Sequence, residues 1–162
     1  MRKQIITAIF LANFIGVNAF AAEQTTLEEI IVTAQKREQS VQEVPIAVSA
    51  FGQDFLEDAG IEDILELQFF VPGLTVYNNQ TVGQTNINIR GVGTAGNSVS
   101  LESSVGIYVD GVYRSRQSSS IGDLVDLERV EVLKGPQGTL FGKNTASGAI
   151  QFLTRKPDLE AV

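Results

Sequence analysis

Glycine is concentrated in one half of this chain, and that bias limits what the sequence can fold into. Of the 14 glycines that follow residue 21, 11 lie from Gly83 onward. Glycine adopts the positive φ angles of tight turns without strain, and it weakens helix interiors. The region after Gly83 is therefore predicted to form short strands and loops rather than long helices.

Strand patterns occur at several places in this glycine-rich half. Residues Asn86–Gly91 and Leu127–Gly135 alternate polar and apolar side chains, and Gly148–Lys156 is predicted to be a further strand. The pair Asp110-Gly111 separates the runs IYV and VY. This pattern predicts a two-residue hairpin, because a type I′ turn needs positive φ at both central residues.

The residues before Gly83 predict one strand and two short helices. A strand over Ile46–Ala50 is followed by a short helix over Gln53–Ala59, with Gly60 placed to end it. A second helix is expected before Pro72, with apolar residues at helical spacing that are predicted to be core: Ile61, Ile64, Leu65 and Phe69. Helices and strands mixed in this order predict an α+β fold rather than repeated βαβ units.

The first 21 residues have the organisation of a secretory signal peptide. A basic start, Met1–Gln4, precedes the apolar run Ile5–Val17, which is too short to span a bilayer comfortably. The small residues of the A-x-A pattern that follows predict cleavage between Ala21 and Ala22. The chain is therefore expected to be exported to a bacterial periplasm or envelope.

Composition excludes several classes of function. The chain has no cysteine and no histidine, which excludes thiolate and histidine metal sites and Ser-His-Asp or Cys-His catalysis. Its formal charge is −7, and loss of Arg2 and Lys3 with the signal peptide would make it −9. Such an acidic chain is poorly suited to nucleic acid, where attraction to phosphate dominates affinity. No metal, cofactor or nucleic-acid partner is expected.

The stretch Lys134–Ile150 has the outward look of a phosphate-binding loop but lacks its pattern. Counting back from Gly142-Lys143, the first glycine of G-x-x-x-x-G-K-[ST] would stand at Gln137, and Asn144 occupies the place of the hydroxyl residue. Nucleotide binding is therefore not expected. Most carboxylates are predicted to lie on helices whose opposite face is apolar, which is the pattern of a solvated face. No catalytic residue is assigned, and the chain is not expected to be an enzyme.

Residues 22–43 are polar and charged except for one β-branched run. The segment "LEEIIVTAQKREQ" places Ile30 to Thr33 between acidic and basic side chains. Such a run fits an edge strand of the following domain. It fits equally well an extended peptide that adds itself to another protein's sheet. The spacing alone leaves both interpretations open.

Taken in order, these segments resemble one protein family. "EEIIVTAQKR" resembles the TonB box of TonB-dependent outer-membrane receptors. The segments "VPGLTV", "INIRGVG", "VGIYVDGVY" and "DLERVEVLKGPQGTLFGKNTASGAIQFLTRKP" resemble successive parts of their plug domain. The resemblance implies a small α+β plug with a short mixed β-sheet and long Gly-rich loops, which fills a large β-barrel. It also implies uptake of a scarce ligand, such as an iron-siderophore complex, cobalamin or a carbohydrate.

The resemblance assigns roles to particular residues. The TonB box, which would bind the periplasmic protein TonB, corresponds to Glu29, Ile30, Ile31, Val32, Thr33 and Ala34. Plug arginines that meet carboxylates on the barrel wall correspond to Arg90 and Arg129. The loops Tyr77–Gln84 and Gly93–Ser103 would face the ligand, with Tyr77, Asn79, Asn97 and Glu102 as candidate residues.

The same resemblance divides the chain into four parts. These are a signal peptide (1–21), a flexible tail with the TonB box (22–43), the plug domain (44–157) and the start of a barrel region (158–162). The β-barrel is expected to be absent from this sequence, so contact with the outer membrane would come only through that partner. The chain is expected to be the amino-terminal piece of a receptor. The alternative is a free-standing, soluble periplasmic module that binds TonB.

Overall fold

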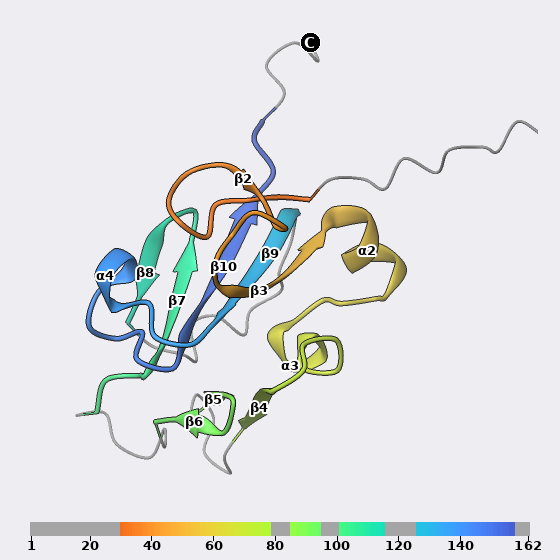
Figure 1. Cartoon of the computed structure of the whole chain (residues 1–162). Helices are drawn as coiled ribbons and strands as arrows, with labels where there is room; N and C mark the ends of the chain where they lie inside the picture. Colours follow the sequence, from red (N-terminus) through yellow and green to blue (C-terminus); the bar gives the residue numbers. More distant parts are fainter. Residues whose placement is uncertain (1–29, 79–84, 95–100, 116–125, 158–162) are drawn as a thin grey trace, which may run out of the picture.

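The computed structural model describes residues 30–78, 85–94, 101–115 and 126–157. Within these residues, strands in three sheets combine with three short helices: α2 (Gln53–Asp58), α3 (Ile64–Leu67) and α4 (Gly138–Phe141). Figure 1 shows α2 beside one edge strand of the largest sheet and α4 near the opposite edge. The fold is therefore α+β, as predicted. No helix in the described ranges is long and apolar enough to cross a membrane.

The largest sheet has five strands and is mixed. Their order is β3 (Ala47–Gly52), β9 (Leu127–Lys134), β10 (Gly148–Thr154), β7 (Val105–Val109) and β8 (Val112–Arg114). β10 runs parallel to β7, whereas the other neighbouring pairs are antiparallel. In the central pair, Glu131 of β9 lies opposite Gln151 of β10, and Val132 lies opposite Ile150.

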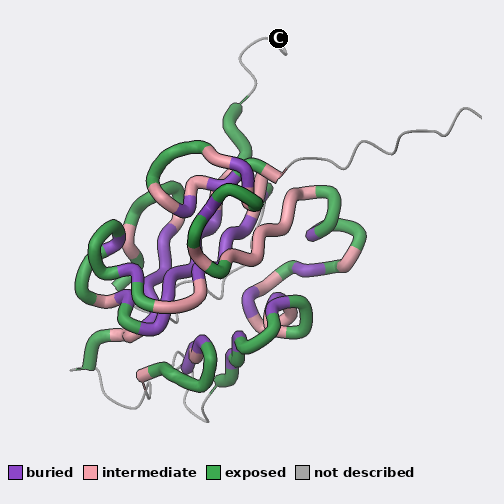
Figure 2. Tube along the Cα trace, in the orientation of Figure 1, coloured by how far each residue is buried: buried purple, intermediate pink, exposed green. Residues whose placement is uncertain are grey.

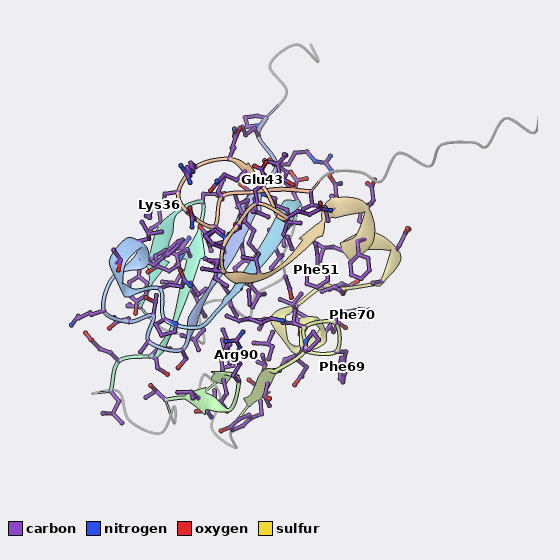
Figure 3. All side chains as sticks on the ribbon, viewed as in Figure 1. Lys36, Glu43, Phe51, Phe69, Phe70 and Arg90 are labelled. Carbon is purple, nitrogen blue, oxygen red and sulfur yellow. The ribbon has the colours of Figure 1, made fainter. Side chains whose placement is uncertain are left out.

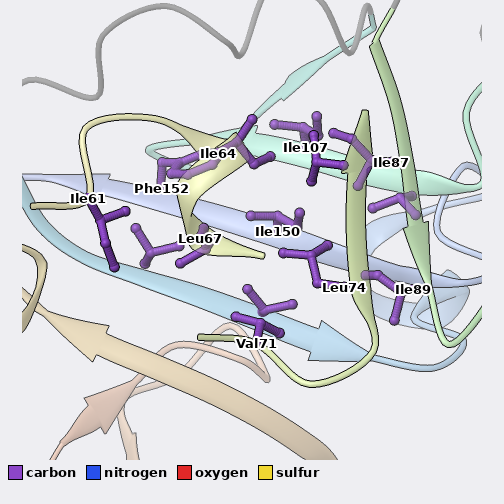
Figure 4. Packing of buried hydrophobic residues seen from close by; sticks show 14 of the residues in the cluster. Ile61, Ile64, Leu67, Val71, Leu74, Ile87, Ile89, Ile107, Ile150 and Phe152 are labelled. Atoms are coloured by element: carbon purple, nitrogen blue, oxygen red, sulfur yellow. The ribbon is translucent and has the colours of Figure 1, made fainter. Parts of the chain in front are cut away.

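One face of this sheet packs against the main core. The covering layer consists of α2, α3 and a small antiparallel sheet of β4 (Leu74–Asn78), β5 (Thr85–Ile89) and β6 (Val92–Gly93). Figure 4 shows side chains of this core and labels Ile61, Ile64, Leu67, Val71, Leu74, Ile87, Ile89, Ile107, Ile150 and Phe152. Burial of each such side chain contributes roughly 1.5–3 kcal/mol, so this layer supplies much of the driving force for folding.

The opposite face of the sheet is covered as well. Tyr108, Leu133 and Ala149, from three neighbouring strands, belong to a second buried cluster with Val32 and Phe141. Because successive side chains of a strand point to opposite faces, β9 contributes Val130 and Val132 to the first core and Leu133 to the second. Figure 2 shows the resulting buried centre of the sheet.

The two predicted helices are present but short. α2 ends where Gly60 adopts a φ of 65°, as predicted from its glycine. α3 begins with a capping box: the Asp63 carboxylate accepts from the Glu66 N–H at 3.0 Å, and the Glu66 carboxylate accepts from the Asp63 N–H. This reciprocal pair fixes the start of α3.

The prediction that Phe69 is core is wrong. Ile61 and Ile64 are buried, but Phe69 is 81% exposed. α3 ends at Leu67, and the N–H of Phe69 then donates to the Glu66 carbonyl in a tighter turn. The helical spacing therefore stops applying before Phe69, which lies at the edge of the structure in Figure 3. Leu67, which is 0% exposed, fills the core position instead.

The hairpin predicted at Asp110-Gly111 is confirmed. Val109 of β7 pairs with Val112 of β8, and the two turn residues have φ of 48° and 78°. The glycine-rich stretch after Lys134 is not entirely loop, although the resemblance implies long Gly-rich loops, because α4 forms within it. The backbone of its last residue, Gly148, lies very close to the backbone of Leu133. A Cβ at Gly148 would be 2.3 Å from the Leu133 carbonyl oxygen.

Candidate partner-binding segment and its docking site

The segment expected to bind TonB folds back on the plug. Strand β1 (Ile31–Val32) pairs antiparallel with β2 (Gln39–Ser40), and the Val41 N–H donates to the Ile30 carbonyl at 3.1 Å. These two strands form a sheet of their own, separate from the five-stranded sheet. A flexible tail is predicted over 22–43. The part that the structure describes, residues 30–43, is folded as this β1–β2 hairpin.

Side chains of the segment alternate between the plug and solvent. Val32 and Ala34 are 0% exposed, whereas Ile31 is 41% exposed. The two buried side chains belong to the second core cluster, with Leu133 and Ala149 of the main sheet. The turn of the hairpin adds a contact, because the Lys36 ammonium lies 5.1 Å from the centre of the Phe141 ring. Hydrophobic burial against the sheet and a cation–π contact with α4 thus both hold the hairpin on the plug.

Glu131 is the polar centre of this docking site. Its side chain is 0% exposed. One carboxylate oxygen accepts from the Thr33 N–H at 2.7 Å, from the Thr33 hydroxyl at 3.1 Å and from Arg129 Nε at 2.9 Å. The other oxygen accepts from Gln151 Nε2 at 3.1 Å. A buried carboxylate is tolerated only when its oxygens are satisfied, and here two donors come from the β1 side. Sequence reasoning assigned Glu131 no role.

Arg129, predicted to face a barrel, is engaged within the plug. Its guanidinium pairs with the Glu128 carboxylate as well as with Glu131, and its side chain is 13% exposed. Its charge thus lies beside two carboxylates of its own strand.

Arg90, the other predicted barrel-facing residue, is exposed and lies near a second cation. Its backbone adopts a φ of 54°, and its N–H donates to the Gly73 carbonyl at 2.7 Å. Partial burial and the charge of Arg90 lower the pKa of Lys134. With the residues that the structure describes, neither cation forms an ion pair. Lys134 was not singled out from the sequence, because alternation alone does not show that it meets Arg90.

Two of the predicted ligand-facing residues are described, and both are exposed. Tyr77 lies in β4 and is 43% exposed. Glu102 pairs with Lys143 at 2.8 Å, and this hydrogen bond raises the pKa of Lys143. The lysine of the apparent phosphate loop thus has a carboxylate partner. The remaining predicted site residues lie outside the described ranges: Ala21, Ala22, Glu29, Asn79 and Asn97.

Curated relatives match most of this chain. The pesticin receptor of Yersinia pestis is 33% identical over 144 residues, which cover 86% of this chain and 21% of the receptor. The iron-regulated outer membrane virulence protein of Vibrio cholerae is 32% identical over 162 residues, which cover 92% of this chain and 23% of that protein. The chain therefore spans about a fifth of the length of the curated relatives that it matches.

A solved structure agrees with the fold. The ferric yersiniabactin uptake receptor FyuA from Yersinia pestis superposes with a TM-score of 0.63 at 34% sequence identity. The superposition covers 70% of this chain and 17% of that receptor. The likeness extends beyond isolated motifs to the arrangement of most of the described elements.

The family follows from the sequence match over most of the plug. The family model of the TonB-dependent Receptor Plug Domain matches residues 40–149. This range includes the five-stranded sheet up to the start of β10, the covering helices and Glu131. Members are receptors rather than enzymes, which confirms the expectation that the chain is not an enzyme. The chain belongs to the TonB-dependent receptor plug domain family.

Proposed function

We propose that this chain is the plug of a TonB-dependent outer-membrane receptor, and that its segment Glu29–Ala34 binds TonB. The observation that carries the proposal is the family match, together with a β-branched strand that lies outside the main sheet. An extended segment of this kind can add itself to a partner's sheet through backbone hydrogen bonds. The tail at 22–43 would then connect the plug to the energy source in the inner membrane.

In this account the chain is exported and acts in the outer membrane. The signal peptide would be removed between Ala21 and Ala22, and the plug would lie inside the β-barrel of the receptor. Relatives described as an outer membrane protein and as a ferric yersiniabactin uptake receptor support this location. They also support uptake of a scarce ligand, with an iron chelate as the first class to test and cobalamin or a carbohydrate as the others.

The contact with the barrel is proposed to involve Arg90 and Arg129. Arg90 is the stronger candidate, because it is exposed and adds its charge to that of Lys134. Carboxylates on a barrel wall would neutralise the charges of Arg90 and Lys134. A contact through Arg129 would have to share a guanidinium that already pairs with Glu128 and Glu131.

Binding of TonB is tested by substitution within the segment. Ile31→Pro removes a backbone donor and fixes φ, so it should weaken binding of the periplasmic domain of TonB at least tenfold in calorimetry. Ile31→Val, which keeps the backbone donor and the β-branched side chain at the same position, is the matched control and should bind normally. Thermal unfolding of both variants would check that the plug is folded. Equal affinity of Ile31→Pro and the unsubstituted chain would rule out pairing through this segment.

A further inference from the structure

Glu131 occupies a position where a carboxylate is costly, and its partners fall into two groups. Arg129 and Gln151 belong to the sheet itself, since Arg129 precedes Glu131 by two residues and Gln151 lies directly opposite. Thr33 is the one partner from the hairpin, 98 residues away in sequence. The sheet alone supplies one donor to each carboxylate oxygen, and Thr33 adds two more donors to the oxygen that Arg129 contacts.

Thr33 depends on Glu131 in turn. The pairing of β1 with β2 ends at Val32, opposite Gln39, so the N–H of Thr33 lies beyond that ladder. Both the N–H and the hydroxyl of Thr33 donate to the same carboxylate oxygen. Hydrogen bonds to a charged acceptor are about twice as strong as neutral ones. Thr33 and Glu131 therefore satisfy each other, and separating them exposes a polar group on each side.

The docked hairpin conflicts with the role proposed for its first strand. A partner that adds this segment to its sheet needs its backbone donors and alternate side chains. Here the Thr33 N–H is engaged by Glu131, and Val32 and Ala34 are 0% exposed. The docked state and the partner-bound state therefore exclude each other.

We propose that Glu131 is a positioning residue that holds Ile30–Ala34 against the sheet, so that the Thr33–Glu131 hydrogen bonds must break before TonB can pair with the segment. The holding role stands on the geometry alone, whereas the consequence for TonB rests on the proposed function. Val32, Ala34 and Lys36 also hold the hairpin, so Glu131 contributes one share of the docking free energy.

Thiol labelling measures how often the segment leaves the sheet. The chain contains no cysteine, so a single Val32→Cys substitution reports opening at a buried residue of β1. Ala149→Cys, buried in the same cluster but on β10, reports opening of the sheet itself. Adding Glu131→Gln, which keeps the shape and removes the charge, should speed labelling at position 32 about tenfold and leave position 149 unchanged.

Matched substitutions separate the holding role from general stability. Glu128→Gln removes the other carboxylate that pairs with Arg129, and it should leave labelling at position 32 unchanged. Thr33→Val deletes the hydroxyl bond alone and should speed labelling severalfold, but have little effect once Glu131→Gln is present. If Glu131→Gln does not fold, labelling at position 32 in the Thr33→Val variant tests the holding role by itself. Unchanged labelling at position 32, or an equal rise at position 149, would overturn the proposal.

A binding experiment separates this inference from the proposed function. If undocking precedes pairing, Glu131→Gln should tighten binding of the periplasmic domain of TonB by up to the same factor as the labelling rate rises. Faster labelling without tighter binding would overturn the link between undocking and TonB. Absence of TonB binding in every variant, including the unsubstituted chain, would instead contradict the proposed function and leave the holding role intact.

Discussion

Arg90 lies close to Lys134, and the two cations share no carboxylate in the described part of the chain. A Cβ at Gly135, next to Lys134, would lie 3.7 Å from Nη1 of Arg90. Partial burial and the charge of Arg90 both lower the pKa of Lys134 below its ordinary value of 10.5. The plug thus concentrates positive charge at one place, although the whole chain is acidic.

Lys134→Gln should stabilise the isolated chain at neutral pH by about 0.5 kcal/mol, because it removes a repulsive and partly desolvated charge. The lowered pKa fixes the pH dependence. Between the lowered pKa of Lys134 in the folded chain and 10.5, the unfolded state binds more protons, so the stability of the unsubstituted chain rises with pH. The difference in stability between this chain and the Lys134→Gln variant therefore shrinks in that range. Urea unfolding at neutral and alkaline pH measures both effects.

Lys143→Gln provides the opposite case. Glu102 raises the pKa of Lys143, so removing this charge should not stabilise the chain. A Lys134→Gln variant that is less stable than the unsubstituted chain at every pH would show that Lys134 has an attractive partner within the plug.

Gly148→Ala should destabilise the chain by about 2 kcal/mol or more, because a Cβ at this position meets the backbone oxygen of Leu133 at 2.3 Å. Relief would require β9 and β10 to separate. Gly138→Ala is the control, since nothing lies within 4 Å of its added Cβ and the residue starts α4. That change should be neutral or stabilising by up to about 1 kcal/mol. Thermal unfolding of the pair tests this, and equal stability of the two variants would contradict the close approach.

Much of the plug was predictable from local patterns. The Asp110-Gly111 turn and the alternating strand at Leu127 were found from residue spacing, because these features depend on near neighbours. Phe69 was misplaced, because helical spacing does not show that α3 ends at Leu67. α4 was missed, since a four-residue helix among glycines has almost no periodicity.

The candidate site was predicted less completely, and for a physical reason. The run Ile30–Thr33 stood out from its polar surroundings, but its docking depends on a carboxylate 98 residues away. The alternation of β9 places Glu131 on the same face as Leu133, which indicates an unusual environment without identifying a partner. Long-range pairs such as Thr33–Glu131 and Arg90–Lys134 are set by the sheet topology, which spacing along the chain does not reveal.

Phe152→Ala should cost about 3–5 kcal/mol of the free energy of unfolding, because the ring is 1% exposed in the main core. Phe69→Ala should change it by less than about 0.5 kcal/mol, because Phe69 is 81% exposed. Chemical unfolding of the two variants gives both values. A cost above about 2 kcal/mol for Phe69→Ala would show that this ring packs in the folded chain.

The chain alone should bind no ferric siderophore, cobalamin or oligosaccharide with useful affinity. Its described ligand-facing candidates, Tyr77 and Glu102, are exposed, and a small molecule needs a concave site that buries most of its surface. Glu102 is paired with Lys143, so this part of the surface offers no excess of positive charge to an anionic chelate. The intact receptor is therefore expected to prefer a neutral polar ligand over a strongly anionic one. Calorimetric titration measures the affinity. Micromolar binding of any of these ligands to the chain alone would contradict the first expectation. Tight binding of an anionic chelate to the intact receptor would contradict the second.

The most direct test of the account is hydrogen exchange of the chain with and without the periplasmic domain of TonB. In the free chain, the hydrogen bond to Glu131 should protect the amide of Thr33, with weaker protection than at Ile150 in the centre of the sheet. Saturating TonB should increase the protection of residues 29–34 and leave the five-stranded sheet unchanged. No change at residues 29–34, or new protection only elsewhere on the plug, would contradict the assignment of this segment as the partner-binding strand.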